Sequence, residues 1–299
     1  MTASNPKVLL LGSDGQVGWE LQRTLSVISE VVNTTLSGQG GLPLDLLDRD
    51  AVAATVRQVR PDFIINAAAH TAVDKAETEV DLSRRLNADA PELLGQLAAE
   101  LGARVIHYST DFVFSGDRDQ PYKEEDETSP LSVYGQTKLE GEQRLLATGA
   151  DALVLRTSWV YGNHGNNFML TMMRLFREKG QLSVVDDQVG APTWSRMIAE
   201  ATAQIVHQLC MATDESAPPL GTYHLTAAGV TSWYGFAARI LELMGGTCKL
   251  QPIPTAEYPT PAKRPAYSVL DNTKLKRTFG LQLPDWKHSL QQCMADRAS

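Results

Sequence analysis

The sequence predicts an α/β fold, in which a doubly wound parallel sheet is joined to a smaller mixed α/β lobe. Two observations lead to this prediction. Short apolar segments alternate with helical patterns from residue 8 to residue 157, which is typical of βαβ units. After about residue 160 this alternation becomes irregular. The 299 residues are enough to bury a substantial core.

The elements of the first half follow from apolar spacing and from end signals. Val8 to Leu11 reads as a buried strand, and Asp48 reads as the cap of a helix that Pro61 stops. Further strands are expected at 30–35, 63–65, 104–108 and 152–157, and helices at 17–28, 49–59, 86–101 and 131–146. Right-handed crossovers then place helices on both faces of the sheet.

The second half suggests a lobe that closes over a ligand. Helices are expected at 168–178, 196–209, 236–244 and 286–294, with apolar stretches at 182–185 and 222–225 and a proline-rich segment at 252–265. We therefore expect a cofactor domain over residues 1–160 and a substrate-binding lobe over residues 161–299, with some segments returning to the first sheet.

Composition excludes several classes of protein. The formal net charge of −8 argues against wrapping nucleic acid, which needs a clustered excess of Lys and Arg. No stretch reaches the roughly 20 apolar residues of a membrane span. The three cysteines, Cys210, Cys248 and Cys293, form no Cys-x-x-Cys pair, which fits a reducing cytoplasm.

A glycine-rich turn, Gly12-Ser13-Asp14-Gly15-Gln16-Val17-Gly18, lies between the first strand and the first helix. Such a turn lets the backbone approach a pyrophosphate, whose charge then faces the helix N-terminus. In this strand–turn–helix context the pattern favours dinucleotide binding by a Rossmann-like sheet over a turn without a ligand.

The end of the second strand bears on the choice of dinucleotide. Many such sheets place an acidic residue there for the adenosine ribose, whereas this chain has Thr34-Thr35-Leu36-Ser37. The missing carboxylate allows a 2′-phosphate, but no nearby arginine selects it. The choice between NADPH and NADH therefore stays open.

A second motif points to carbonyl reduction. Tyr134 and Lys138 are four residues apart on an expected helix and share one face. A lysine ammonium would lower the pKa of the tyrosine hydroxyl and make it a better proton donor. Ser109-Thr110-Asp111 follows the fourth strand, whose end faces the ligand crevice, so a hydroxyl there can bond the reacting oxygen. Each pattern alone also fits an ordinary solvated helix or turn, and their conjunction carries the prediction.

With these residues the chain resembles the extended short-chain dehydrogenase/reductases, and within them the reductases of 4-keto nucleotide sugars. The resemblance spans nearly the whole chain. It rests on the glycine turn and on Arg60-Pro61-Asp62, Asn66 to Asp74, His107 to Phe114, Tyr134 to Leu139, Arg156 to Tyr161, Gly165 to Phe168, Gly190 to Thr193 and Arg264-Pro265.

The resemblance implies reduction of the C4 ketone of dTDP-4-dehydro-β-L-rhamnose, with Tyr134 as proton donor and Lys138 and Thr110 as its catalytic partners. It implies that NADPH or NADH contacts Gly12, Gly15, Gln16, Val17, Gly18, Asp45, Leu46, Ala69, His70, Thr71, Tyr134 and Lys138. The substrate would contact Thr110, Asp111, Trp159, Asn167 and Arg264. Trp159 also fits a core aromatic residue, and Lys263-Arg264 fits either a diphosphate clamp or plain surface charge.

Several alternatives stay open at this point. Some members of the family use Mg²⁺, for which Asp186-Asp187 is a candidate pair without assigned ligands, although such a pair is also typical of a solvated turn. Phe112 stands where related dehydratases carry a glutamate, which counts against dehydration but not against epimerisation. A non-catalytic subunit on the same fold is a further alternative, which the intact Thr110, Tyr134 and Lys138 disfavour. Extended relatives often dimerise, so a homodimer is also open.

Two histidines of these motifs have competing interpretations. His70 follows a strand end and fits a crevice-lining residue better than a catalytic base. His107 lies inside the fourth strand and is expected to be a hydrogen-bonded core residue. The methionines Met169, Met172 and Met173 are expected to fill the core face of a helix.

Overall fold

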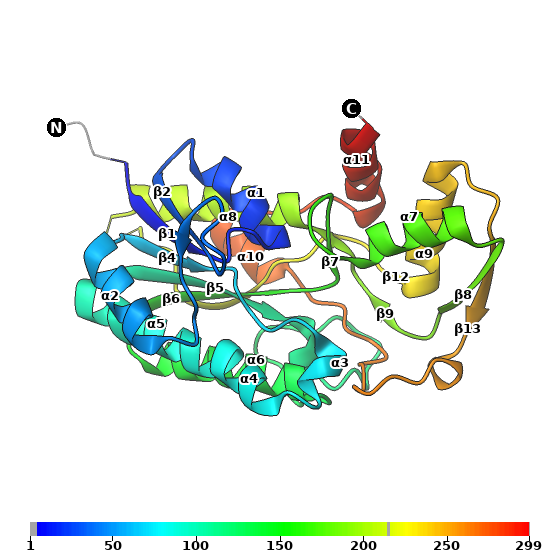
Figure 1. The fold of residues 1–299 in the computed structure, drawn as a ribbon, viewed down its shortest axis with the longest axis horizontal. Helices are drawn as coiled ribbons and strands as arrows, with labels where there is room; N and C mark the ends of the chain where they lie inside the picture. Colours follow the sequence, from blue (N-terminus) through cyan, green and yellow to red (C-terminus); the bar gives the residue numbers. More distant parts are fainter. Residues whose placement is uncertain (1–4, 214–215, 299) are drawn as a thin grey trace.

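A seven-stranded parallel sheet forms the centre of the molecule, in the order β11-β6-β5-β4-β1-β2-β3 (Figure 1). The computed structural model describes residues 5–213 and 216–298. The strands of this sheet are β1 Lys7–Leu11, β2 Glu30–Thr35, β3 Leu42–Pro43, β4 Phe63–Asn66, β5 Arg104–Thr110, β6 Asp151–Thr157 and β11 Gly221–His224. The predicted doubly wound α/β fold is confirmed.

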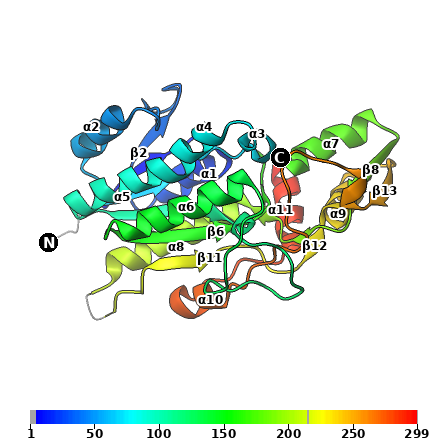
Figure 2. The same ribbon diagram turned by 90° about the horizontal axis from the view of Figure 1, so that it is seen from below.

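Helices cover both faces of this sheet, and successive residues of β1 face opposite layers. Val8 and Leu10 pack under α1, α8 and α10, whereas Leu9 and Leu11 pack under α2, α5 and α6. Figure 2 shows α5 and α6 running side by side along one of these faces. The helices are α1 Gln16–Leu25, α2 Arg49–Val59, α5 Ala90–Leu101, α6 Val133–Ala147, α8 Ser195–Met211 and α10 Thr273–Phe279. Burying one such apolar side chain contributes about 1.5–3 kcal/mol, so both layers hold the sheet in place.

Residues at the ends of α2 and α5 cap or stop these helices as the sequence predicted. The Asp48 side chain accepts a hydrogen bond from Ala51 N at 3.0 Å and so caps α2. Arg60, with φ of 50°, ends that helix before Pro61. Gly102, with φ of 69°, ends α5.

The segment before α5 is less regular than the apolar spacing indicated. Leu86 lies in a π-helical turn, η1 Arg85–Asp89, which follows α3 Val73–Ala76 and α4 Val80–Arg84. Pro91 at the start of α5 has no N–H to donate to the carbonyl of Asn87, so the regular α-helical bond cannot form there. That carbonyl lies so close to Gly141 of α6 that a Cβ at Gly141 would overlap it. The first helix also ends at Leu25, three residues before the predicted end.

The remaining elements build a second lobe around its own apolar cluster. They are α7 Phe168–Glu178, α9 Trp233–Met244, α11 Trp286–Ala298, β7 Val160–Tyr161, β8 Gln181–Val185, β9 Val189–Gly190, β10 Thr193–Trp194, β12 Thr231–Ser232, β13 Lys249–Ile253 and the 3₁₀ turn η3 Thr255–Glu257. Another 3₁₀ turn, η2 Asp111–Val113, directly follows β5 of the central sheet. Met169, Met172 and Met173 of α7 are buried against α9 and α11, as their spacing predicted.

Chain order and spatial order differ at the boundary between the two parts. β11, α8 and α10 all follow residue 161, yet they complete the central sheet and cover one of its faces. The division into 1–160 and 161–299 stays a prediction. Within residues 5–213 and 216–298, no helix has both the length and the apolar character to cross a membrane.

Candidate active site

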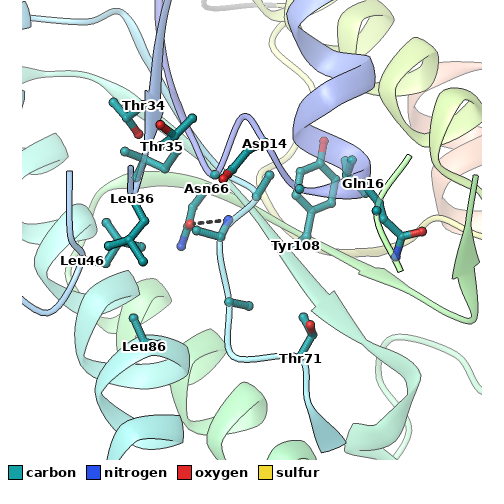
Figure 3. Close-up of a pocket in the computed structure, with 18 of the residues that line it drawn as sticks. Asp14, Gln16, Thr34, Thr35, Leu36, Leu46, Asn66, Thr71, Leu86 and Tyr108 are labelled. Carbon is teal, nitrogen blue, oxygen red and sulfur yellow. Dashed lines mark hydrogen bonds between the residues drawn. The ribbon is translucent and has the colours of Figure 1, made fainter. Parts of the chain in front are cut away.

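A cavity of about 690 Å³ runs along the carboxyl edge of the central sheet. Its size lies within the range of small-molecule and cofactor sites. The glycine-rich turn lies at its middle, the ends of β2 and β3 line one end, and β5, α6 and β6 line the other. Figure 3 shows Thr34, Leu36 and Leu46 on one side and Gln16, Thr71 and Tyr108 on the other.

The glycine turn brings backbone N–H groups to the cavity. Gly12 adopts φ of 71°, and a Cβ there would lie 2.8 Å from Ala68 N. A Cβ at Gly18 would overlap the carbonyl oxygen of Gly12, so only glycine lets α1 start this close to the turn. Gly12, Gly15, Gln16 and Val17 line the cavity, whereas Gly18 is buried behind them. The first N–H groups of α1 have no acceptor within the helix, and Gln16 and Val17 of this first turn line the cavity, which suits a bound anion.

The end of the cavity beside β2 and β3 is formed by Thr34, Thr35 and Leu36 together with Asp45 and Leu46. The Asp45 carboxylate accepts a hydrogen bond from Leu47 N at 2.9 Å, which shapes the loop. The residues at the end of β2 are threonine and leucine, so the carboxylate at this end of the cavity comes from Asp45, in the loop after β3, and not from β2.

The segment after β4 is fixed by an asparagine that the sequence reading did not single out. Asn87 of η1 accepts from His70 N at 2.9 Å, and its Nδ2 donates to His70 O and to Thr137 Oγ1. Ala69 and Thr71 consequently line the cavity. The ring of His70 points elsewhere, because it lies 3.0 Å from Ser83 Oγ and 2.9 Å from Glu79 Oε2.

Tyr134 and Lys138 both reach the cavity from α6. Ser132 caps this helix by accepting from Gly135 N at 3.2 Å, so the tyrosine sits in the first turn. Burial raises the pKa of Tyr134 to about 12, and a hydrogen bond with Thr110 opposes the shift. The expectation of a lowered pKa is therefore wrong, because burial outweighs the hydrogen bond with Thr110 and the nearby Asp111 also raises the pKa.

Lys138 is almost fully buried, with 2% of its surface exposed. Its Nζ donates to the carbonyl of Tyr108 at 2.6 Å and lies 3.2 Å from Nε2 of His107. Burial lowers the pKa of Lys138 to about 8, although Glu142 favours the ammonium.

Thr110 ends β5 and Asp111 begins η2; both lie just behind the cavity lining, where Thr110 hydrogen-bonds the Tyr134 hydroxyl. Thr110 Oγ1 accepts from Phe112 N and donates to Asp111 Oδ1 at 3.1 Å. Burial raises the pKa of Asp111 to about 7, against hydrogen bonds from Ser268 and Thr110. A carboxyl group with this pKa exchanges protons near neutrality.

Unpartnered polar atoms show what kind of ligand the cavity fits. Ser109 Oγ, Thr157 Oγ1 and Gln16 Oε1 are buried and have no hydrogen-bond partner among the described residues. All three residues line the cavity. Because buried polar groups are rarely left unpaired, these atoms fit a ligand that carries amide, hydroxyl and phosphate groups, as a nicotinamide dinucleotide does.

The residues predicted to bind substrate lie outside the lining of this cavity. Trp159, at φ of 45°, stacks on Trp233 with ring centroids 3.6 Å apart. Asn167 caps α7 and donates to the carbonyl of Gly162. Arg264 bonds Asp74 at 2.8 Å, which ties the proline-rich segment to α3.

A loop of the second lobe, residues 164–166, lies against the glycine-rich turn. Gly165 and Asn166 line the cavity, and His164 donates from Nε2 to the carbonyl of Asp14 at 2.8 Å. The His164 ring also stacks on Trp19. The sequence motif at Gly165 to Phe168 was noted, but no local signal pairs this loop with residues 150 positions earlier.

The acidic pair considered for magnesium is engaged in protein contacts. Asp186 accepts from Ser232 Oγ, and Asp187 accepts from both the backbone and the hydroxyl of Thr255. Across the part of the chain that the structure describes, no group of three or more His, Cys, Asp and Glu side chains is placed to hold a metal ion. The residues present do not fit a bound Mg²⁺.

Comparisons with known proteins agree with this site. The family model described as "RmlD substrate binding domain" matches residues 6–299. The dTDP-4-dehydrorhamnose reductase of Escherichia coli K12 is 44% identical over 298 residues, which cover 96% of each chain. The solved dTDP-4-dehydrorhamnose reductase of Clostridium acetobutylicum is 39% identical, with a TM-score of 0.90 over 98% of this chain and 100% of the other.

A further solved structure carries a cofactor. The dTDP-4-dehydrorhamnose reductase of Bacillus anthracis, in complex with NADP, is 32% identical, with a TM-score of 0.90 over 98% of this chain and 99% of its own. On the full-length family match and these identities, the chain belongs to the RmlD family, that of the dTDP-4-dehydrorhamnose reductases.

Proposed function

We propose that this chain reduces dTDP-4-dehydro-β-L-rhamnose to dTDP-β-L-rhamnose with NAD(P)H, the last step of dTDP-L-rhamnose biosynthesis. The observation that carries the proposal is that Tyr134 and Lys138 line one end of a dinucleotide-sized cavity, where the Tyr134 hydroxyl hydrogen-bonds Thr110. The chain is 44% identical to a reductase of this substrate over nearly its whole length.

Tyr134 is the proton donor in this proposal. Its raised pKa keeps the hydroxyl protonated at neutral pH, so a proton is available for the C4 oxygen of the sugar. Thr110 holds the same oxygen through its hydroxyl. Lys138 stabilises the phenolate left on Tyr134, because both side chains project from one face of α6.

The cofactor residues are those along the cavity. Gly12, Gly15, Gln16 and Val17 would hold the pyrophosphate, Asp45 and Leu46 the adenine, and Ala69 and Thr71 the nicotinamide half. Gly18 would act by letting α1 approach the turn. His70 would contribute its backbone, since its ring bonds Ser83 and Glu79. The bound nicotinamide supplies the hydride, and the chain supplies position and the proton.

The substrate would lie between this end of the cavity and the second lobe. Asp111 would contact the sugar and the Trp159 ring would pack on the sugar or nucleotide, while Asn167 would fix the loop beside it. Arg264 would bind the diphosphate, either in place of its ion pair with Asp74 or in addition to it.

We propose that the enzyme is cytoplasmic, where NAD(P)H and sugar nucleotides are available. We also propose a homodimer, which size-exclusion chromatography with light scattering would test.

A single assay separates the candidate functions. The protein is mixed with dTDP-4-dehydro-β-L-rhamnose and either NADPH or NADH, and the loss of absorbance of the reduced cofactor is followed. A reductase consumes one equivalent of cofactor per substrate, whereas an epimerase or dehydratase returns the hydride and shows no net oxidation. Absence of substrate-dependent oxidation with both cofactors would remove the proposed function, and dTDP-glucose serves as the control sugar.

A further inference from the structure

A row of buried, hydrogen-bonded polar side chains runs from α6 through β5 to β4. Nζ of Lys138 lies 3.2 Å from Nε2 of His107, and Nδ1 of the same ring lies 3.1 Å from Nδ2 of Asn66. Asn66 Oδ1 in turn accepts from Ala68 N at 3.1 Å (Figure 3). Lys138, His107 and Asn66 are each no more than 2% exposed, so their polar atoms depend mainly on one another for hydrogen bonds.

The position of each proton along these buried side chains follows from their hydrogen-bond partners. Burial holds the pKa of His107 well below its usual range, so the ring is neutral and carries one N–H. The backbone N–H of Ala68 requires the Asn66 oxygen on its side, which turns the Asn66 amide N–H toward Nδ1 of His107. Nδ1 is therefore the acceptor, and the ring proton sits on Nε2.

This tautomer constrains the lysine. The Nε2–H of His107 points at Nζ of Lys138, and only an uncharged amine has a lone pair to accept it. An ammonium would place two donors against each other at 3.2 Å. Moving the ring proton to Nδ1 shifts the same conflict to Asn66, and turning the Asn66 amide shifts it to Ala68.

We propose that His107 is a positioning residue that favours the uncharged amine of Lys138 in the free enzyme, by donating its Nε2 proton to Nζ. The second N–H contact of the amine, to the carbonyl of Tyr108 at 2.6 Å, is kept in this arrangement. Burial of the lysine acts in the same direction.

Other ionisable groups near Lys138 and His107 also influence whether the lysine is protonated. On α6, Glu142 favours the ammonium, but its carboxylate is shared with Arg156 of β6 in a buried ion pair of 2.7 Å. Tyr134 of α6, Asp111 of η2 and Tyr108 of β5 complete the ionisable groups on this side. On the other side of α6, Glu140 and Arg144 pair with charged residues of α4, η1 and α5.

The consequence for catalysis rests on the proposed function. With a pKa of about 8, Lys138 is an ammonium in most molecules at neutral pH and an uncharged amine in the rest, which is the form that His107 favours. Once Tyr134 has given its proton to the sugar oxygen, the phenolate favours the ammonium, and the uncharged fraction of Lys138 takes up a proton from water. His107 thus makes the lysine charge depend on the state of Tyr134.

The test measures the ionisation of Lys138 directly and needs no turnover. Ligand-free protein with [¹³Cε]lysine is titrated by NMR, and Lys138 is assigned by the signal that Lys138→Arg removes. We expect half-protonation at or below pH about 8 in the unchanged protein. His107→Gln offers an amide oxygen to an ammonium, so the midpoint should rise by about one pH unit. His207→Gln, on the exposed side of α8, is the matched control and should leave it unchanged.

A folded His107→Gln variant whose Lys138 titrates at the original pH would overturn the proposal. If that variant does not fold, ¹⁵N NMR of the unchanged protein decides, because the proposal requires the Nε2–H tautomer of His107. The Nδ1–H tautomer would also overturn it. Loss of the proposed reductase activity would leave both measurements intact, so the two proposals fail separately. With activity present, the alkaline limb of kcat/KM should move to higher pH in His107→Gln.

Discussion

Tyr134 carries its proton at neutral pH, because burial raises the pKa of its hydroxyl to about 12. A proton donor with so high a pKa needs help when it becomes a phenolate. Thr110 hydrogen-bonds this hydroxyl, and Lys138 lines the same end of the cavity. The sequence predicted these three residues through their spacing, but it could not predict the direction of the pKa shift, which depends on packing around the ring.

The substitution Tyr134→Phe tests this role. The ring and its edge contact with Phe112 are retained, so the cavity should keep its shape. We expect kcat to fall by roughly 10²- to 10⁴-fold, the usual contribution of general acid catalysis, while NADPH binding by fluorescence titration is unchanged. Tyr258→Phe, which alters an exposed ring, is the control. A Tyr134→Phe enzyme that turns over at the original rate would show that another group donates the proton.

At the scale of elements, caps and glycines place the site. α2 begins where Asp48 accepts from Ala51 N, and this helix supports the β2–β3 end of the cavity. Its first turn also contains Asp50, which forms no cap. Both aspartates are exposed near the start of α2, but Asp48 is the N-cap residue that accepts a backbone hydrogen bond, whereas Asp50 lies inside the first turn.

We expect Asp48→Ala to lower the free energy of unfolding by about 1 kcal/mol, the typical value of an N-cap. Asp50→Ala removes an equivalent negative charge near the same helix end and should cost only a few tenths of a kcal/mol. Urea unfolding followed by circular dichroism measures both. Equal losses in the two variants would mean that charge, and not the cap, stabilises the start of α2.

The elements that the sequence predicted share one property: their signals are local. β2 at Glu30–Thr35 and α7 at Phe168–Glu178 lie where their apolar periodicity placed them. The π-helical turn at Arg85–Asp89 was missed, because it depends on Pro91 and on contact with Gly141 of another helix. The contact of His164 with Asp14 was missed for a similar reason, since 150 residues separate the partners.

For the molecule as a whole, the later half of the chain completes the earlier half. β11 pairs with β6, and α8 covers Leu10, Leu21 and Leu155 in one continuous apolar cluster. A chain cut after residue 160 would leave this face of the sheet open to water. The cofactor sheet therefore depends on residues that lie beyond the predicted boundary.

We accordingly expect the fragment 1–160 to lack a cooperative thermal transition when it is expressed alone. Co-expression with 161–299 should restore the transition and NADPH binding, because β11 and α8 are then supplied. Circular dichroism and cofactor fluorescence measure the two properties. A sharp melting transition of 1–160 by itself would show that the first half is an independent domain.

The central claim is that a hydride from the nicotinamide reaches C4 of the sugar at the end of the cavity where Tyr134 lies. The most direct measurement uses NADPH deuterated at the transferred position of its C4, with dTDP-4-dehydro-β-L-rhamnose, and analyses the product by NMR. The account predicts dTDP-β-L-rhamnose with one deuterium at C4 and a solvent proton on the new hydroxyl. A product without deuterium at C4, or a sugar returned unreduced with the label still on the cofactor, would contradict it.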